Sequence, residues 1–147
     1  KGQYDAVREY PYIDDVFALI SYSVLDKVGG YDDSLFLLYE EADLIQRSKK
    51  FGFKCMFTPK AKAWHKESKS HGKVSYTRYF HHERSQIIFV FKHQTIPKKL
   101  YFITKKLLFS LPSTFISLSI KGRVNLFGAT LRGTISGLRY IISNKFK

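Results

Sequence analysis

The sequence predicts an α/β domain over residues 1–95, followed by a basic amphipathic helical region over residues 96–147. Apolar runs of strand length alternate with helical patterns in the first part, whereas helical periodicity continues alone through the second. All twelve acidic residues lie at or before Glu83, so the second part carries only positive charge. With 147 residues and 44% hydrophobic content, the chain is long enough to bury a core.

The first elements are short. Residues 15–21 ("DVFALIS") are predicted to form a strand, with Ser23 as the N-cap of a short helix in "VLDKV". Gly29 and Gly30 then stop that helix. The stretch "GGYDD" is either an ordinary helix C-cap turn or a loop that places Tyr31 and Asp32 beside a site.

A helix is predicted from about Glu40 to Phe51, ended by Gly52. Its first turn contains Glu40, Glu41 and Asp43, directly after the apolar run "LFLLY". Acids in a first turn complement the helix dipole, which is the structural explanation. Carboxylates at the edge of an apolar site also serve as general bases, which is the catalytic one.

Two further strands are predicted, in "KCMFT" (residues 54–58) and in "KAKAWH" (residues 60–65). Cys55, the single cysteine, is expected to be a small buried side chain rather than a nucleophile. His65 ends the second strand. Its residue type allows either a structural or a metal-binding role.

The run "GGYDDSLFLLYEEADLIQRSKKFGFKCMFTPKAKAWH" resembles the second half of the catalytic domain of family 2 glycosyltransferases, in particular the rhamnosyltransferase-like branch. Those enzymes typically show a Gly-Gly-Phe-Asp-Glu loop, a Glu-Asp-x-Asp-Leu helix start, a Gly-Tyr-Lys strand, a Pro and then a His. The similarity covers roughly residues 2–95 and continues more weakly through "ATLRGTISGLR". It implies a partial GT-A (nucleotide-diphospho-sugar transferase) fold. It also implies inverting transfer of a sugar such as rhamnose in cell-surface polysaccharide biosynthesis.

The resemblance also implies roles for individual residues. Glu41 stands where the family has its catalytic base, with Glu40 as the second candidate. Asp43 is the third acid of the candidate catalytic set and is expected to fix the helix or the loop before it. The family's metal-binding histidine corresponds to His65, and the metal would be a divalent cation, Mg²⁺ or Mn²⁺. The residues expected on the acceptor and donor side are Gly30, Tyr31, Asp32 and Arg47; Arg47 either pairs with Asp43 at i,i+4 or reaches toward phosphate.

The expected substrates are a nucleotide-sugar donor and a glycan or lipid-linked acceptor. The chain departs from the family in two ways: Glu41 replaces an Asp, and no nucleotide-binding half with an Asp-x-Asp motif is present. We therefore expect a segment of a longer enzyme that is not active alone. The polar "KESKSHGK" after His65 corresponds to a flexible flap in the family.

A helix is predicted over residues 75–93, at the end of the first part. The apolar run from Lys98 onward is interrupted by Lys105, Lys106 and Pro112, which argues against a membrane-spanning helix. We expect an amphipathic helix at the membrane surface with its lysines at the headgroups, and a peripheral position at the cytoplasmic face. Alternatively, these helices pack onto the catalytic domain.

Nucleic-acid binding is not expected, because the chain shows no RNA-recognition signature and no helix-turn-helix pattern. Two functions other than catalysis remain as alternatives. One is a non-catalytic, basic, membrane-associated binding module. The other is a degenerate transferase kept for partner binding, which the Glu at the base position and the missing half make worth considering.

Overall fold

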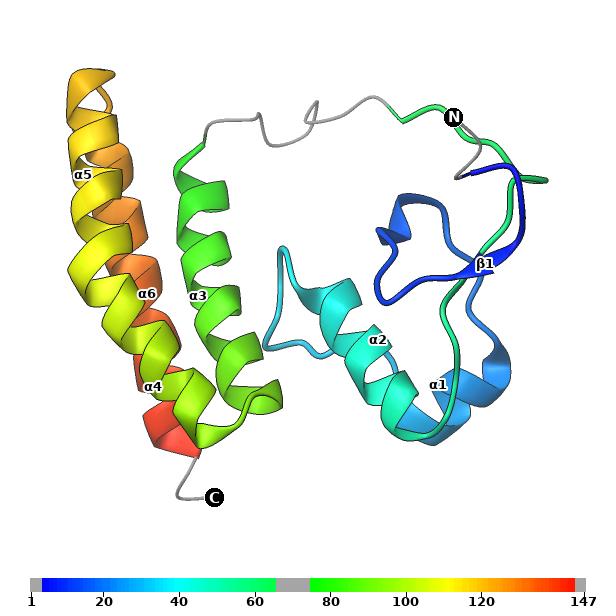
Figure 1. The fold of residues 1–147 in the computed structure, drawn as a ribbon. Helices are drawn as coiled ribbons and strands as arrows, with labels where there is room; N and C mark the ends of the chain where they lie inside the picture. The colour runs from blue at the N-terminus through cyan, green and yellow to red at the C-terminus, as the bar shows by residue number, and fades with distance from the viewer. Residues whose placement is uncertain (1–3, 66–74, 145–147) are drawn as a thin grey trace. The chain divides into compact units, whose positions relative to one another are not determined.

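The computed structural model describes residues 4–65 and 75–144 and divides into two compact units (Figure 1). Unit 1 consists of Lys1–Asp32 and Glu40–Lys69, and unit 2 of Asp33–Tyr39 and Ser70–Lys147. Helices dominate, and the described residues contain one sheet of two short strands. The predicted α/β, partial GT-A fold is therefore wrong. A strand forms only where another strand pairs with it, and most apolar runs of the first half have no such partner.

The described residues of unit 1 form two short strands, one 3₁₀ turn and two helices. Strand β1 (Arg8–Glu9) pairs antiparallel with β2 (Met56–Phe57), with Arg8 opposite Phe57. The other elements are η1 (Asp15–Phe17), α1 (Tyr22–Val28) and α2 (Glu40–Lys50). The strand predicted at residues 15–21 is replaced by η1 and extended chain, and residues 60–65 form no strand. Helix α1 begins after Ser21 rather than after Ser23.

Helix α2 confirms the helix predicted from the acidic first turn and basic last turn. It ends at Gly52, whose φ of 82° is a left-handed conformation that glycine adopts without strain. The Phe53 N–H donates to the Ser48 carbonyl oxygen at 3.2 Å, which satisfies one of the last carbonyls of the helix. The C-terminal end of this helix therefore follows from Gly52 and the residues beside it.

Unit 2 is a helical assembly. It contains α3 (Tyr76–His93), α4 (Ile96–Lys105), η2 (Lys106–Ser110), α5 (Leu111–Ile120) and α6 (Val124–Asn144). Helix α3 confirms the helix predicted at residues 75–93. The elements α4, η2 and α5 form one uninterrupted helix over residues 96–120, which we call the long helix. No helix among the described residues has both the length and the apolar character needed to cross a membrane.

Segment η2 is a wider π-helical turn in the middle of the long helix. The Leu111 N–H donates to the Lys106 carbonyl oxygen, five residues back, instead of four. Such a turn accommodates one extra residue and rotates the side chains that follow it relative to those before it. Lys106, the first residue of η2, is only 5% exposed.

Helices α3 and α6 approach each other closely through small residues. Ile87 of α3 is fully buried, and so is Ala129 of α6. A Cβ atom added to Gly133 would overlap the Phe80 carbonyl oxygen, and one added to Gly137 would lie 3.0 Å from the Arg84 carbonyl oxygen. Glycine at both positions therefore lets the two backbones come together.

A buried ion pair joins α3 to the long helix. The Lys106 Nζ lies 2.5 Å from Glu83 Oε2 and donates to Gln86 Oε1 at 2.8 Å. The expectation that the lysines of this run lie at lipid headgroups is wrong for Lys106, because Glu83 neutralises it inside unit 2. Burial alone raises the pKa of the Glu83 carboxyl, but the His82 hydrogen bond and the Lys106 ammonium outweigh burial and lower it.

The segment Asp33–Tyr39 belongs to unit 2 although it precedes α2 in the chain. Leu35 is 2% exposed, and the Ser85 hydroxyl of α3 donates to the Leu37 carbonyl oxygen at 3.1 Å. The Gln86 side-chain amide donates to the Tyr39 hydroxyl at 3.1 Å. Helix α3 thus holds this segment through its side chains.

The close contact between α3 and α6 gives a stability prediction. We expect Gly133→Ala to destabilise unit 2 by about 1–3 kcal/mol, because the added methyl group meets backbone rather than a flexible side chain. Gly128→Ala in the same helix is the matched control. A methyl group added at Gly128 would meet nothing within 4 Å, so this change should stabilise by about 0.5–1 kcal/mol. Urea unfolding followed by far-ultraviolet circular dichroism compares the two; equal effects would contradict the close packing.

The lowered pKa of Glu83 predicts a pH dependence. A carboxyl with a lower pKa in the folded chain stabilises the fold above its ordinary value of 4.5, and this contribution is lost as the pH falls through the lowered value. Stability should therefore fall on acidification below about pH 5. Glu83→Gln should be less stable at pH 7 but should lose less on acidification. Glu9→Gln, which removes a carboxylate 49% exposed, is the control and should keep the wild-type slope.

Candidate functional site

The candidate site is built on the first turn of α2, where three acids occupy different environments. Asp43 is fully buried, whereas Glu40 and Glu41 are half-buried. All three lie where carboxylates interact favourably with the positive end of the helix dipole. Their side-chain contacts distinguish the acid that stabilises the fold from those that remain at the surface of the unit.

Asp43 forms an internal ion pair with Arg47. The Arg47 Nε donates to Asp43 Oδ2 at 2.7 Å, one helical turn apart, which agrees with one of the two alternatives predicted from the sequence. The same guanidinium donates to the carbonyl oxygens of Val28 and Gly30, the latter at 2.6 Å. Arg47 therefore fixes the turn after α1 against α2, and Asp43 holds Arg47 in place.

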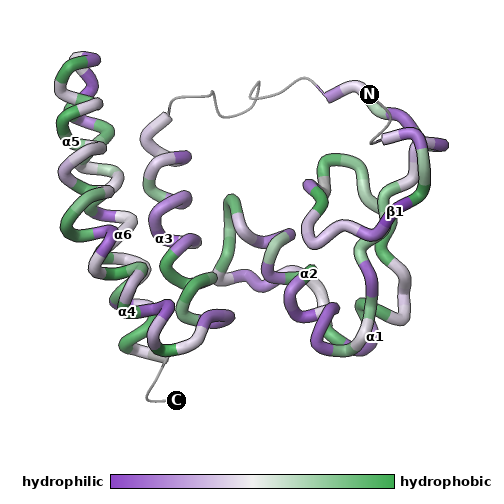
Figure 2. Tube along the Cα trace, viewed as in Figure 1, coloured by the Kyte–Doolittle hydropathy of each residue, from purple (hydrophilic) through white to green (hydrophobic). Residues whose placement is uncertain are grey.

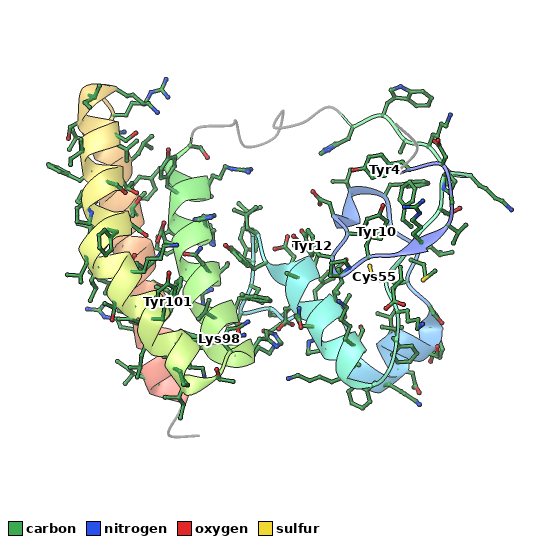
Figure 3. All side chains as sticks on the ribbon, viewed as in Figure 1. Tyr4, Tyr10, Tyr12, Cys55, Lys98 and Tyr101 are labelled. Carbon is green, nitrogen blue, oxygen red and sulfur yellow. The ribbon has the colours of Figure 1, made fainter. Side chains whose placement is uncertain are left out.

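Glu41 has a different partner. The Tyr12 hydroxyl, labelled in Figure 3, donates a hydrogen bond to Glu41 Oε1. Tyr12 comes from the loop after β1 and is 46% exposed. Sequence reasoning missed Tyr12, and no local pattern marks it, because its role depends on a contact across 29 positions of the chain. The pair forms a carboxylate held by a phenol at the surface of unit 1.

The predicted binding residues Tyr31 and Asp32 follow the turn that Arg47 fixes. Gly30 accepts a hydrogen bond from Arg47 through its backbone carbonyl oxygen, which ties this turn to α2. Tyr31 is 46% exposed and Asp32 is half-buried. The structure thus brings Gly30, Arg47 and Asp43 together, and Glu41 together with Tyr12.

His65, the predicted metal ligand, lies exposed in the extended chain after β2. Within residues 4–65 and 75–144, no three His, Cys, Asp or Glu side chains gather closely enough to hold a metal ion. The described part of this chain therefore offers His65 as a single candidate ligand rather than a metal centre. The predicted flap, "KESKSHGK", lies outside the described residues.

Cys55, labelled in Figure 3, is half-buried beside β2. Burial raises the pKa of its thiol, and the nearby Lys49 offsets only part of that effect. The thiol is therefore protonated at neutral pH, and a protonated thiol is a poor nucleophile. The expected burial of Cys55 is therefore met in part, because the side chain is half-buried rather than buried.

The backbone leading into α2 is unusual. Leu38 and Tyr39 have positive φ angles of 69° and 72°, although neither is a glycine. Such residues cost of order 1–3 kcal/mol each and persist where surrounding contacts hold them. Here Gln86 holds the Tyr39 hydroxyl, and the ring of Phe89 lies 5.4 Å from that of Tyr39.

No protein-family model, curated protein or solved structure matches this chain.

The contacts of Arg47 give a prediction for the site. Arg47→Met removes the ion pair of the fully buried Asp43, and breaking a buried pair from one side typically costs about 3–5 kcal/mol. We expect the backbone amides of α2 to lose hydrogen-exchange protection by about a hundredfold or more. Lys54→Met removes the exposed ion pair with Glu9 and is the matched control, with an expected change within about 1 kcal/mol. Equal protection in both variants would show that Arg47 does not hold the site.

Proposed function

We propose that this chain is the acceptor-side part of a glycosyltransferase and that Glu41 is its general base. The donor would be a nucleotide sugar and the acceptor a glycan or lipid-linked glycan. The observation that carries the proposal is the division of roles in the first turn of α2. Asp43 is buried against Arg47, whereas Glu41 keeps a half-buried carboxylate at the surface of the unit, beside the Tyr12 hydroxyl.

The proposed reaction is an inverting displacement. Glu41 takes the proton from an acceptor hydroxyl, and the resulting oxygen attacks the anomeric carbon of the donor sugar. The bond from that carbon to the nucleoside diphosphate breaks, and the diphosphate leaves with the bonding electron pair. Tyr12 holds one carboxylate oxygen through its hydroxyl, which orients Glu41 and leaves the other oxygen for the acceptor.

The motif supports the same assignment through its resemblance to family 2 glycosyltransferases. Glu41 corresponds to the base of that family, although the family carries Asp there. A divalent cation is part of the implied chemistry, and His65 is the ligand that this chain would contribute. The described residues form no metal cluster around His65, and the proposed proton transfer is assigned to Glu41 with Tyr12 beside it.

The test is sugar transfer by the longer enzyme that the resemblance implies, assayed with a panel of nucleotide sugars and divalent cations. We expect Glu41→Gln to lower kcat by about 10²–10⁴ while nucleotide-sugar binding is kept, because the amide cannot accept the proton. Glu41→Asp, which restores the family residue, should retain transfer. Tyr12→Phe should lower kcat by a smaller factor, because it removes the hydrogen bond that orients the Glu41 carboxylate but keeps the carboxylate itself.

Glu9→Gln is the matched control for the charge change, because Glu9 is a carboxylate of unit 1 in a surface ion pair with Lys54. It should transfer sugar at the wild-type rate. Unchanged turnover in Glu41→Gln would overturn the proposal. It would favour the alternative interpretation of this chain, a non-catalytic binding module or a degenerate transferase.

A further inference from the structure

The long helix presents a large apolar surface to its surroundings. Nine large apolar side chains along it are at least 45% exposed. They lie before, within and after the π-helical turn, and the hydropathy of this stretch can be followed along α4 and α5 in Figure 2. These residues are Ile96, Leu100, Tyr101, Leu107, Leu108, Phe109, Phe115, Ile116 and Ile120. A surface of this kind marks an interaction site.

The interior of unit 2 combines apolar side chains, such as Ile87, Ile88 and Leu118, with a smaller set of polar groups. The ion pair between Glu83 and Lys106 is buried, as are the hydroxyl groups of Ser85, Thr130 and Thr134. Helices α3 and α6 approach each other closely at Gly133 and Gly137. Unit 2 therefore has apolar residues in its own core and a second set of apolar side chains exposed along the long helix, and this exposed set suits a partner that is itself apolar.

The positive charge of the chain after Glu83 indicates the charge that a partner of the long helix should have. Glu83 is the last acid in the sequence, and twelve Lys and Arg residues follow it. Lys98 and Lys105 of α4 are exposed, as are Lys121 and Arg123 at the turn after α5. Two copies of this face would bring like charges together without acids to neutralise them. An anionic apolar partner, in contrast, satisfies both the charge and the apolar surface.

We propose that the exposed side of the long helix binds the surface of a membrane that contains anionic phospholipids. Its leucine, isoleucine and phenylalanine side chains enter the acyl region, and Lys98 and Lys105 remain at the headgroups. Lys105 is exposed in the middle of the long helix, where a spanning helix would place a charge in the hydrocarbon. The helix therefore lies along the interface. Lys98 and Tyr101 are labelled on α4 in Figure 3.

The test is co-sedimentation of the 147-residue chain with lipid vesicles. One set is phosphatidylcholine alone, and in the other phosphatidylglycerol replaces about a third of it. We expect strong binding to the anionic vesicles that weakens as salt is added. Leu108→Ser combined with Phe109→Ser should lower the partition coefficient about tenfold or more, because both side chains are over 60% exposed and contribute by entering lipid.

Phe17→Ser combined with Leu19→Ser is the matched control. It makes the same two changes at exposed positions of unit 1 and should bind as the wild type does. Lys98→Gln combined with Lys105→Gln tests the charge, and should weaken binding to the anionic vesicles by about tenfold or more, with little effect on phosphatidylcholine vesicles. Circular dichroism verifies that each variant keeps its helices.

Three results would overturn the proposal. The first is no binding of the wild-type chain to either vesicle. The second is equal loss in the long-helix pair and in the unit 1 pair. The third is a dimer in solution that Leu108→Ser with Phe109→Ser dissociates, which would assign the face to a second copy of the chain. None of these measurements depends on sugar transfer, so this proposal and the proposed activity succeed or fail separately.

Discussion

The buried ion pair between Glu83 and Lys106 is the interaction on which unit 2 depends. Glu83 belongs to α3, Lys106 to the π-helical turn of the long helix, and Thr134 of α6 lies 3.5 Å from the same carboxylate. Gln86 extends the network to Tyr39 in the segment before α2. Removing Glu83 would leave the buried Lys106 ammonium with the neutral Gln86 as its partner, and removing Lys106 would leave Glu83 with His82 and Thr134, so the four parts of unit 2 are specified together. Because Lys106 faces Glu83 inside unit 2, its charge does not lie on the exposed side of the long helix.

The sequence predicts the elements whose signals are local. The acids, bases and glycine of α2 lie within a few residues of each other, and α3 shows a clear helical period, so both helices are predictable. The strands are not, because pairing depends on distant residues, and β1 and β2 pair over only two residues each. Dependence on a distant residue also explains why the sequence wrongly predicts Lys106 at the lipid headgroups. Its partner is 23 residues earlier, and only the fold shows that Glu83 rather than a headgroup neutralises it.

The candidate site is predictable in part. The residue types of Glu41 and Asp43 fit either a catalytic role or stabilisation of the helix end, and only their contacts in the fold distinguish these roles. Asp43 pairs with Arg47, which also donates to the carbonyl oxygens of Val28 and Gly30. Glu41 instead accepts a hydrogen bond from Tyr12, which lies 29 positions earlier in the chain. Leu44 is the one apolar side chain of unit 1 that is buried among the described residues. Polar contacts rather than a large core therefore determine the geometry around α2.

The assignment of Asp33–Tyr39 to unit 2 has a topological consequence. The chain enters unit 2 with this segment, returns to unit 1 for α2, and enters unit 2 again before α3. Neither unit is continuous in the sequence, so a cut between them cannot yield two intact folding units. A fragment beginning at α3 would lack Leu35 and the Tyr39 contacts, and would expose the surface of α3 that they cover. Contact between Asp33–Tyr39 and α3 closes a loop of chain that contains α2. Folding of unit 2 therefore includes the entropy cost of closing a loop that belongs to unit 1.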